Sequence, residues 1–220
     1  MTAAPVRIVT VTRELGAGGS EFARLLGQHL GWPVLDHDIV HRVAERLRLD
    51  DDTVEHFDEH PPSLLARIAA VLVVPQPELF DLPPVDTLPS HDRIARAATR
   101  CIRDAGAAPP LVVVGHGAAC IFAGRADVLH VFLHGPFEAR VRRVVERLGV
   151  PAAKAPAVVR RADHERQQYV QRYFHVDWRA DALYDLRVGT GAVPVPELVA
   201  FVERLVRARD AGAAPVHAVP

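Results

Sequence analysis

The sequence predicts an α/β fold in which a five-stranded parallel sheet is flanked by helices. Five short apolar runs, most of them rich in β-branched residues, alternate with longer segments whose apolar residues recur at helical spacing. The 220 residues are 49% apolar and 24% charged, which suits one packed domain. We therefore expect a single domain over residues 1–210, followed by a flexible tail at residues 211–220.

The first 50 residues predict strand, glycine loop, helix, strand and helix. A β-branched run at residues 6–12 is suited to a buried parallel strand, and a glycine-rich turn at residues 16–20 follows it. Apolar side chains at helical spacing then predict a helix over residues 21–30, which Gly31 ends. The next strand and helix are expected at residues 33–36 and 38–49.

Residues 50–110 differ in character and predict a helical insertion. Acidic residues dominate positions 50–59, and seven prolines between residues 61 and 89 are incompatible with a sheet. The run at residues 68–74 is more apolar than the face of a solvated helix, so something must cover it. We expect the insertion to close over the bound substrate or to support self-association as a homodimer. Its helices are predicted at residues 63–74 and 90–105.

The remaining three strands and the last helices lie beyond residue 110. The tight turn Gly115-His116-Gly117 follows the third strand. Two arginine-rich helical segments separate the fourth and fifth strands, and we expect the region of about residues 150–180 to form a lid. The strands are predicted at residues 111–114, 128–133 and 184–188, and the helices at residues 136–149, 157–173 and 196–209.

Composition excludes several classes of protein. The 26 basic and 27 acidic residues nearly cancel, which disfavours a nucleic-acid polymer as partner. Two cysteines cannot form a disulfide framework, and no apolar run approaches the roughly 20 residues that span a bilayer, so we expect a cytoplasmic protein without a membrane partner. Lys154 is the only lysine, so arginines and backbone amides must hold any anionic ligand.

The glycine loop admits two ligand classes, or none if it is a plain turn. A dinucleotide site needs a third small residue where Glu21 stands, although Gly16, Gly18 and Asp36 have suitable spacing. A mononucleotide loop ends in Gly-Lys-Ser/Thr, and residues 18–20 match that ending except that Gly19 replaces the lysine. Such a loop would cradle phosphates with the backbone amides of Gly16, Ala17, Gly18, Gly19 and Ser20.

Arg13 is the only basic residue of the loop, and we expect it to do the work of the missing lysine. A guanidinium always carries charge and binds two phosphate oxygens at once, and its reach compensates for its position at the start of the loop. The alternative is that Arg13 turns outward and pairs with Glu14 or Glu21, which are close in sequence.

Four segments in order resemble the cytidylate kinase-like family of P-loop nucleoside monophosphate kinases. The loop itself reads Thr-Arg-Glu-Leu-Gly-Ala-Gly-Gly-Ser at residues 12–20. The others are Trp-x-x-x-Asp at residues 32–36, a Phe-Leu-x-x-Pro-x-x-x-Arg-x-x-Arg element at residues 132–143, and a last signature that runs from Asp163, Arg166 and Tyr169 through residues 177–178 to residues 184–186.

The resemblance implies a kinase-type fold, ATP and Mg²⁺, and a role for each matching residue. Ser20 and Asp36 would serve the metal ion. Asp36, Asp38 and Arg42 would bind the acceptor, and Asp163 with Arg166 would read its cytosine ring and its phosphate. Asp38 can equally cap its helix, and Asp163 with Arg166 can be an ordinary surface ion pair. The residues expected to be catalytic are Arg13, Ser20 and the lid arginines Arg140, Arg143, Arg160 and Arg161.

The function predicted on these grounds is transfer of the γ-phosphoryl group of ATP to a small acceptor, a nucleoside monophosphate such as CMP. His116 stands where relatives in the resembled family carry an arginine for the acceptor phosphate, so tight monophosphate binding or the identity of the acceptor is in question. Two alternatives stay open. One is a catalytically degenerate nucleotide-binding module, and the other is a dinucleotide-dependent oxidoreductase.

Overall fold

The computed structural model describes residues 4–36 and 91–212 of the chain. Its contacts divide the chain into two units, one of residues 1–35 with 109–220 and the other of residues 36–108. The second unit begins earlier than the predicted insertion at 50–110, and its described part contains helix α4 (His91–Ala105). Asp38, Arg42, the apolar run 68–74 and the tail beyond residue 212 lie outside the described residues.

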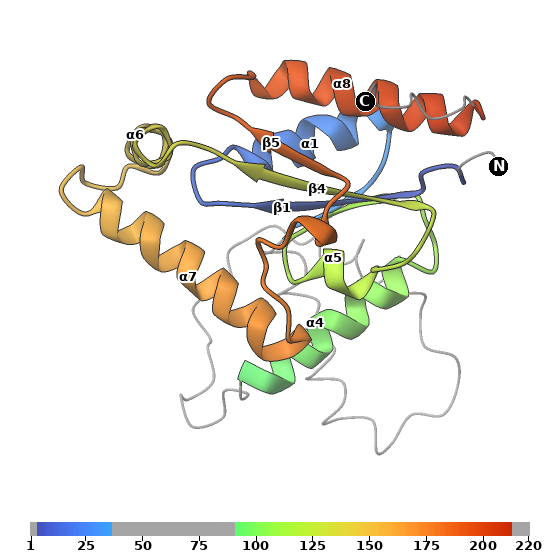
Figure 1. The fold of residues 1–220 in the computed structure, drawn as a ribbon, viewed down its shortest axis with the longest axis horizontal. Helices are drawn as coiled ribbons and strands as arrows, with labels where there is room; N and C mark the ends of the chain where they lie inside the picture. Colours follow the sequence, from blue (N-terminus) through green and yellow to red (C-terminus); the bar gives the residue numbers. More distant parts are fainter. Residues whose placement is uncertain (1–3, 37–90, 213–220) are drawn as a thin grey trace, which may run out of the picture. The chain divides into compact units, whose positions relative to one another are not determined.

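The first unit contains a five-stranded sheet in which every neighbouring pair is parallel, as predicted (Figure 1). The strand order is β2-β3-β1-β4-β5, so the first strand of the chain lies at the centre. The register pairs Ile8 with both Leu111 and Val128. The strands are β1 (Ile8–Arg13), β2 (Val34–Leu35), β3 (Leu111–Val114), β4 (Val128–His134) and β5 (Leu186–Gly189).

Helices cover both faces of this sheet because its central strands are apolar on both sides. Figure 1 shows α1 and α8 on one face and α5 and α7 on the other. Phe22 of α1 and Val199 of α8 pack in one core with Val131, whereas the next residue of β4, Phe132, packs with Trp178 on the opposite face. The helices are α1 (Gly19–Leu30), α5 (Ala118–Ile121), α6 (Phe137–Leu148), α7 (Ala155–Phe174) and α8 (Val195–Asp210), with a 3-10 turn at Asp181–Leu183.

The boundaries differ from the predicted ones at two functionally relevant ends. Helix α1 begins at Gly19 instead of residue 21, because Gly18 in the left-handed conformation (φ 80°) turns the chain directly into the helix. Strand β5 begins at Leu186, two residues late, because the amide of Tyr184 is bonded to Asp181 in the 3-10 turn. No helix in the described ranges combines the length and the apolar character that crossing a bilayer requires.

Parallel pairing places the carboxyl ends of the strands at one edge of the sheet. The glycine loop leaves β1 there, Gly115 follows β3, and Gly135 follows β4. Open α/β sheets bind ligands at this edge, where loops of non-adjacent strands meet. The fold thus gathers there the loop-borne residues that the sequence singled out.

Candidate functional site

The glycine loop joins β1 to α1 and presents the amino end of the helix. Gly16 and Gly18 both have φ 80°, which side chains rarely adopt. A Cβ on Gly16 would overlap the backbone carbonyl of Arg140, so loop and helix α6 approach too closely for any side chain. Ser20 is exposed in the first turn of α1, where the first N–H groups have no partner within the helix. The free N–H groups and the positive end of the helix dipole form a site suited to binding an anion.

The side chain of Arg13 lies across Gly19 and reaches the end of the neighbouring strand. A Cβ on Gly19 would lie 2.5 Å from Arg13 Cγ, and a Cβ on Gly115 would overlap Arg13 Nη1. The arginine therefore fills the space in which a side chain at position 19 would begin. The loop can hold Arg13 in this orientation or a lysine at position 19, but not both.

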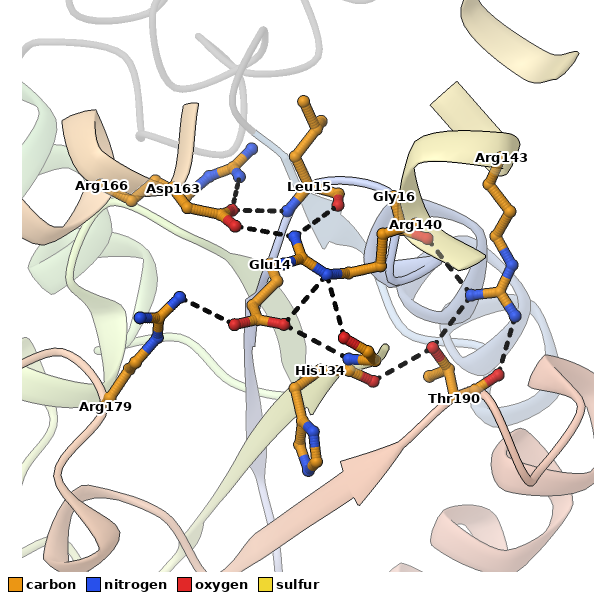
Figure 2. Close-up of polar contacts among 11 residues, drawn as sticks. Glu14, Leu15, Gly16, His134, Arg140, Arg143, Asp163, Arg166, Arg179 and Thr190 are labelled. Atoms are coloured by element: carbon orange, nitrogen blue, oxygen red, sulfur yellow. Dashed lines mark hydrogen bonds and ion pairs between the residues drawn. The ribbon is translucent and has the colours of Figure 1, made fainter. Parts of the chain in front are cut away.

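The two carboxylates considered as partners of Arg13 have other arginine contacts. Glu14 pairs with Arg140 and Arg179, with N–O distances of 3.2 and 2.8 Å. Glu21 pairs with Arg147 of α6. Glu14 is 9% exposed and also accepts a hydrogen bond from the amide of Gly135 at 3.3 Å, so it ties the loop to the end of β4 (Figure 2).

Arg140 lies beneath the loop with its donors directed at protein acceptors. It is 5% exposed. Its Nε donates to the carbonyl of Gly135 at 3.1 Å, and its Nη1 donates to the carbonyl of Leu15 at 3.0 Å and to Asp163 Oδ2 at 2.7 Å (Figure 2). These contacts hold the loop from below. They differ from the lid position that the sequence predicted for Arg140.

Arg143, one turn further along α6, binds the other side of the loop. It donates to the carbonyl of Gly16 at 3.2 Å and to Thr190 Oγ1 and O at 3.0 and 2.7 Å. Thr190, 2% exposed, donates in turn to the carbonyl of His134. Arg143 therefore joins the loop to the segment after β5.

Asp163 of helix α7 is buried against the loop and is not a surface ion-pair residue. Its Oδ1 accepts the amide N–H of Leu15 at 2.8 Å, and its Oδ2 accepts Arg140 (Figure 2). Arg166, one turn along α7, donates to Oδ1 at 3.3 Å. Burial lowers the pKa of Arg166, and the charge of Asp163 acts in the opposite direction. The surface-pair alternative is wrong, because Asp163 is only 7% exposed.

The other predicted residues fall into separate places. Arg161 is exposed and pairs with Glu165 on the same helix, and Arg160 stacks on the ring of Phe137. His116, with φ 50°, lies edge-on to the ring of Tyr169. Asp36 directly follows β2 but belongs to the second unit.

Three residues of this site were missed by reading the sequence as isolated motifs. Glu14 carried a signal, since a carboxylate between a buried strand and a glycine loop must find partners when it is buried. Arg179 and Thr190 carried none, because they reach the site from loops far along the chain.

A parallel sheet whose central strand leads through a glycine loop to the amino end of a helix is the arrangement that P-loop folds and dinucleotide-binding folds share. The cytidylate kinase-like family model matches residues 8–192, most of the chain. The chain belongs to the cytidylate kinase-like family.

Solved structures share the fold at low sequence identity. An uncharacterized protein of Eubacterium ventriosum has a TM-score of 0.66 at 21% identity, over 91% of this chain and 98% of that one. A gluconokinase of Sinorhizobium meliloti has a TM-score of 0.51 at 17% identity (96% and 99%), and a shikimate kinase of Acinetobacter baumannii in complex with shikimate has 0.50 at 13% (92% and 94%). The fold is therefore that of P-loop kinases.

One curated relative matches in sequence. It is a uronate isomerase of Corynebacterium glutamicum, 26% identical over 122 residues that make up 56% of this chain. The chain spans 23% of the length of that relative.

Proposed function

We propose that the chain is a phosphotransferase that moves the γ-phosphoryl group of ATP to a small acceptor, with nucleoside monophosphates, CMP first, as the acceptor class. The observation that carries the proposal is the position of Arg13, whose side chain fills the space of the absent loop lysine and reaches the end of β3. A cation at that place, beside the amino end of α1, is what a bound triphosphate requires.

The residues around the loop fit Mg²⁺–ATP. The loop glycines and the first amides of α1 form an anion cradle, and the exposed hydroxyl of Ser20 is a suitable ligand for the metal ion. Bound Mg²⁺–ATP would supply the transferable phosphoryl group and a cation that neutralises its oxygens. The family resemblance is the ground on which Asp36 is proposed to assist the metal ion through water.

Catalysis in this proposal consists of positioning and charge neutralisation. Among the described residues, five arginines lie in or contact the loop, Glu14 or the buried Asp163 of α7. Positive charge is therefore in excess over these two carboxylates around the loop. Arg13 would bind the phosphoryl oxygens, whereas Arg140 and Arg143 would keep the loop carbonyls turned away from them. The five are Arg13, Arg140, Arg143, Arg166 and Arg179.

The acceptor would lie beside Gly115-His116-Gly117, close to Arg13 Nη1. A Cβ on Gly117 would overlap the ring of Phe174, so this turn is packed against the aromatic end of α7. His116 is shorter than the arginine that members of the resembled family carry here, and an imidazole lacks the permanent charge and the bidentate donors of a guanidinium. The presence of histidine instead of arginine at position 116 favours a second candidate function, that of a nucleotide-binding module that holds ATP and transfers no phosphoryl group.

The decisive experiment compares Arg13→Ala with Arg24→Ala, a control on the exposed face of α1. Calorimetry with Mg²⁺–ATP and a coupled assay with CMP measure affinity and turnover. We expect Arg13→Ala to weaken ATP binding by about tenfold or more and to lower turnover further, because a charge-assisted bidentate contact is lost. Arg24→Ala should leave both unchanged. Equal behaviour of the two variants would refute the role of Arg13, and ATP binding without turnover of any acceptor by the wild type would favour the module.

The overlap between a side chain at position 19 and the side chain of Arg13 allows a reciprocal test. Gly19→Lys in the wild-type background should impair ATP binding, because the new side chain overlaps Arg13. Gly19→Lys combined with Arg13→Ala should recover binding relative to Arg13→Ala alone, since one cation then occupies the space. A double variant that binds no better than Arg13→Ala would show that the two positions do not share a role.

A further inference from the structure

We propose that Asp163 is a positioning residue that sets the shape of the glycine loop from helix α7 and does not read the acceptor base. This differs from the base-reading role that the family resemblance implies for the Asp-x-x-Arg segment. The effect on ATP rests on the proposed function, whereas the effect on the loop backbone does not.

Both carboxylate oxygens of Asp163 are engaged within the protein. Oδ1 accepts Leu15 N–H at 2.8 Å and Arg166 Nη1 at 3.3 Å, and Oδ2 accepts Arg140 Nη1 at 2.7 Å. The side chain is 9% exposed. To bind Asp163, a base would have to displace these charge-assisted bonds from a buried carboxylate. That displacement costs more free energy than binding to an exposed carboxylate would.

Asp163 binds the loop at Leu15, directly before the phosphate cradle. Leu15 lies between Arg13 and the left-handed Gly16. Asp163 binds its N–H while Arg140, paired with Asp163, binds its C=O at 3.0 Å. The peptide groups on both sides of Leu15 are therefore oriented by one ion pair (Figure 2). The orientation of the second peptide determines how the chain enters Gly16 and the phosphate cradle.

The contact between Asp163 and the loop joins distant parts of the chain. Asp163 and Leu15 are 148 residues apart, and Glu14 binds the same Arg140 at 3.2 Å. Helix α7 contributes Asp163 and the loop contributes Glu14, and both carboxylates pair with the same buried arginine, Arg140 of α6. Any displacement of α7 at Asp163 would release Leu15, so the helix and the loop are coupled by this contact.

The experiment uses the full chain with Asp163→Asn and, as a matched control on the same helix, Glu165→Gln, whose side chain is 57% exposed. Hydrogen exchange of the peptide that covers residues 13–20 is measured without ligand, together with Mg²⁺–ATP affinity and the CMP-to-UMP ratio of kcat/KM. We expect faster exchange confined to the loop, about tenfold weaker ATP binding and an unchanged ratio. Glu165→Gln should match the wild type.

Other outcomes overturn the proposal. Unchanged loop exchange with an altered CMP-to-UMP ratio would make Asp163 a base reader. Exchange that rises equally across the sheet would make it a general stability residue. A measurement on the wild type alone is decisive if the variant does not fold: the amide of Leu15 must exchange more slowly than those of Gly18 and Gly19, and equal rates would overturn the proposal. If the wild type binds no ATP, the exchange result still tests the positioning role.

Discussion

At the scale of single residues, the loop carries an arginine at position 13 and a glycine where the loop lysine of other P-loops would stand, at position 19. Position 13 lies at the end of β1 and position 19 at the start of α1, yet the side chain of Arg13 passes over Gly19. Position 19 therefore requires glycine because the side chain of Arg13 approaches it closely. A side chain at position 19 and Arg13 in its present orientation exclude each other.

His130 lies within the sheet beside Thr10, and its titration should be visible in stability. Thr10 Oγ1 and His130 Nδ1 are 2.8 Å apart in the paired register of β1 and β4. Burial lowers the pKa of His130, and the charge of Asp185 opposes this effect. Between the lowered pKa and the ordinary value near 6.5, the unfolded chain binds more protons, so stability falls as the pH drops through that range.

The variant His130→Asn keeps a polar partner for Thr10 and does not titrate. We expect the wild type to lose more stability than this variant between pH 7.5 and pH 5, as measured by urea unfolding at each pH. Parallel pH profiles of the two proteins would contradict the assignment, because the remaining groups are common to both.

At the scale of elements, helix α1 approaches β2 through a glycine. A Cβ on Gly27 would overlap Val34 Cγ2 and would lie 2.9 Å from the backbone oxygen of Trp32. Gly27 therefore sets the distance at which the first helix packs beside the sheet. This distance in turn positions the amino end of α1 at the loop.

Gly27→Ala should destabilise the protein, although alanine is the better helix former. Helix propensity favours alanine by about 1 kcal/mol, whereas overpacking against backbone costs about 1–3 kcal/mol. We expect a net loss, measured by denaturant unfolding, because the carbonyl of Trp32 cannot rotate away as a side chain can. Gln28→Ala on the exposed face of the same helix is the control and should be near neutral. A more stable Gly27→Ala variant would show that helix and strand can separate at no cost.

At the scale of the whole molecule, the order of elements could be predicted and the side-chain network could not. Strands β1, β3 and β4 follow from β-branched runs bounded by glycine or proline, and the glycine loop follows from local chemistry. The bond between Asp163 and Leu15 joins parts of the chain whose proximity only the completed sheet creates. The motif assigned Asp163 to the acceptor and carried no sign of its bond to Leu15, whereas the fold prediction was confirmed.

Bound nucleotide should raise the thermal stability of the whole chain. A ligand that binds only the folded state at 100 times its Kd adds about 2.7 kcal/mol, and each kcal/mol raises Tm by about 2–4 °C for a chain of this size. We expect Mg²⁺–ATP to raise the Tm of the wild type and of Arg24→Ala by about 5–11 °C at that saturation. At the same concentration, Arg13→Ala should gain clearly less, because its site is less occupied. NAD at equal concentration serves as the control for a dinucleotide site, and a rise with NAD but not with Mg²⁺–ATP would contradict both the proposed ligand and the proposed role of Arg13.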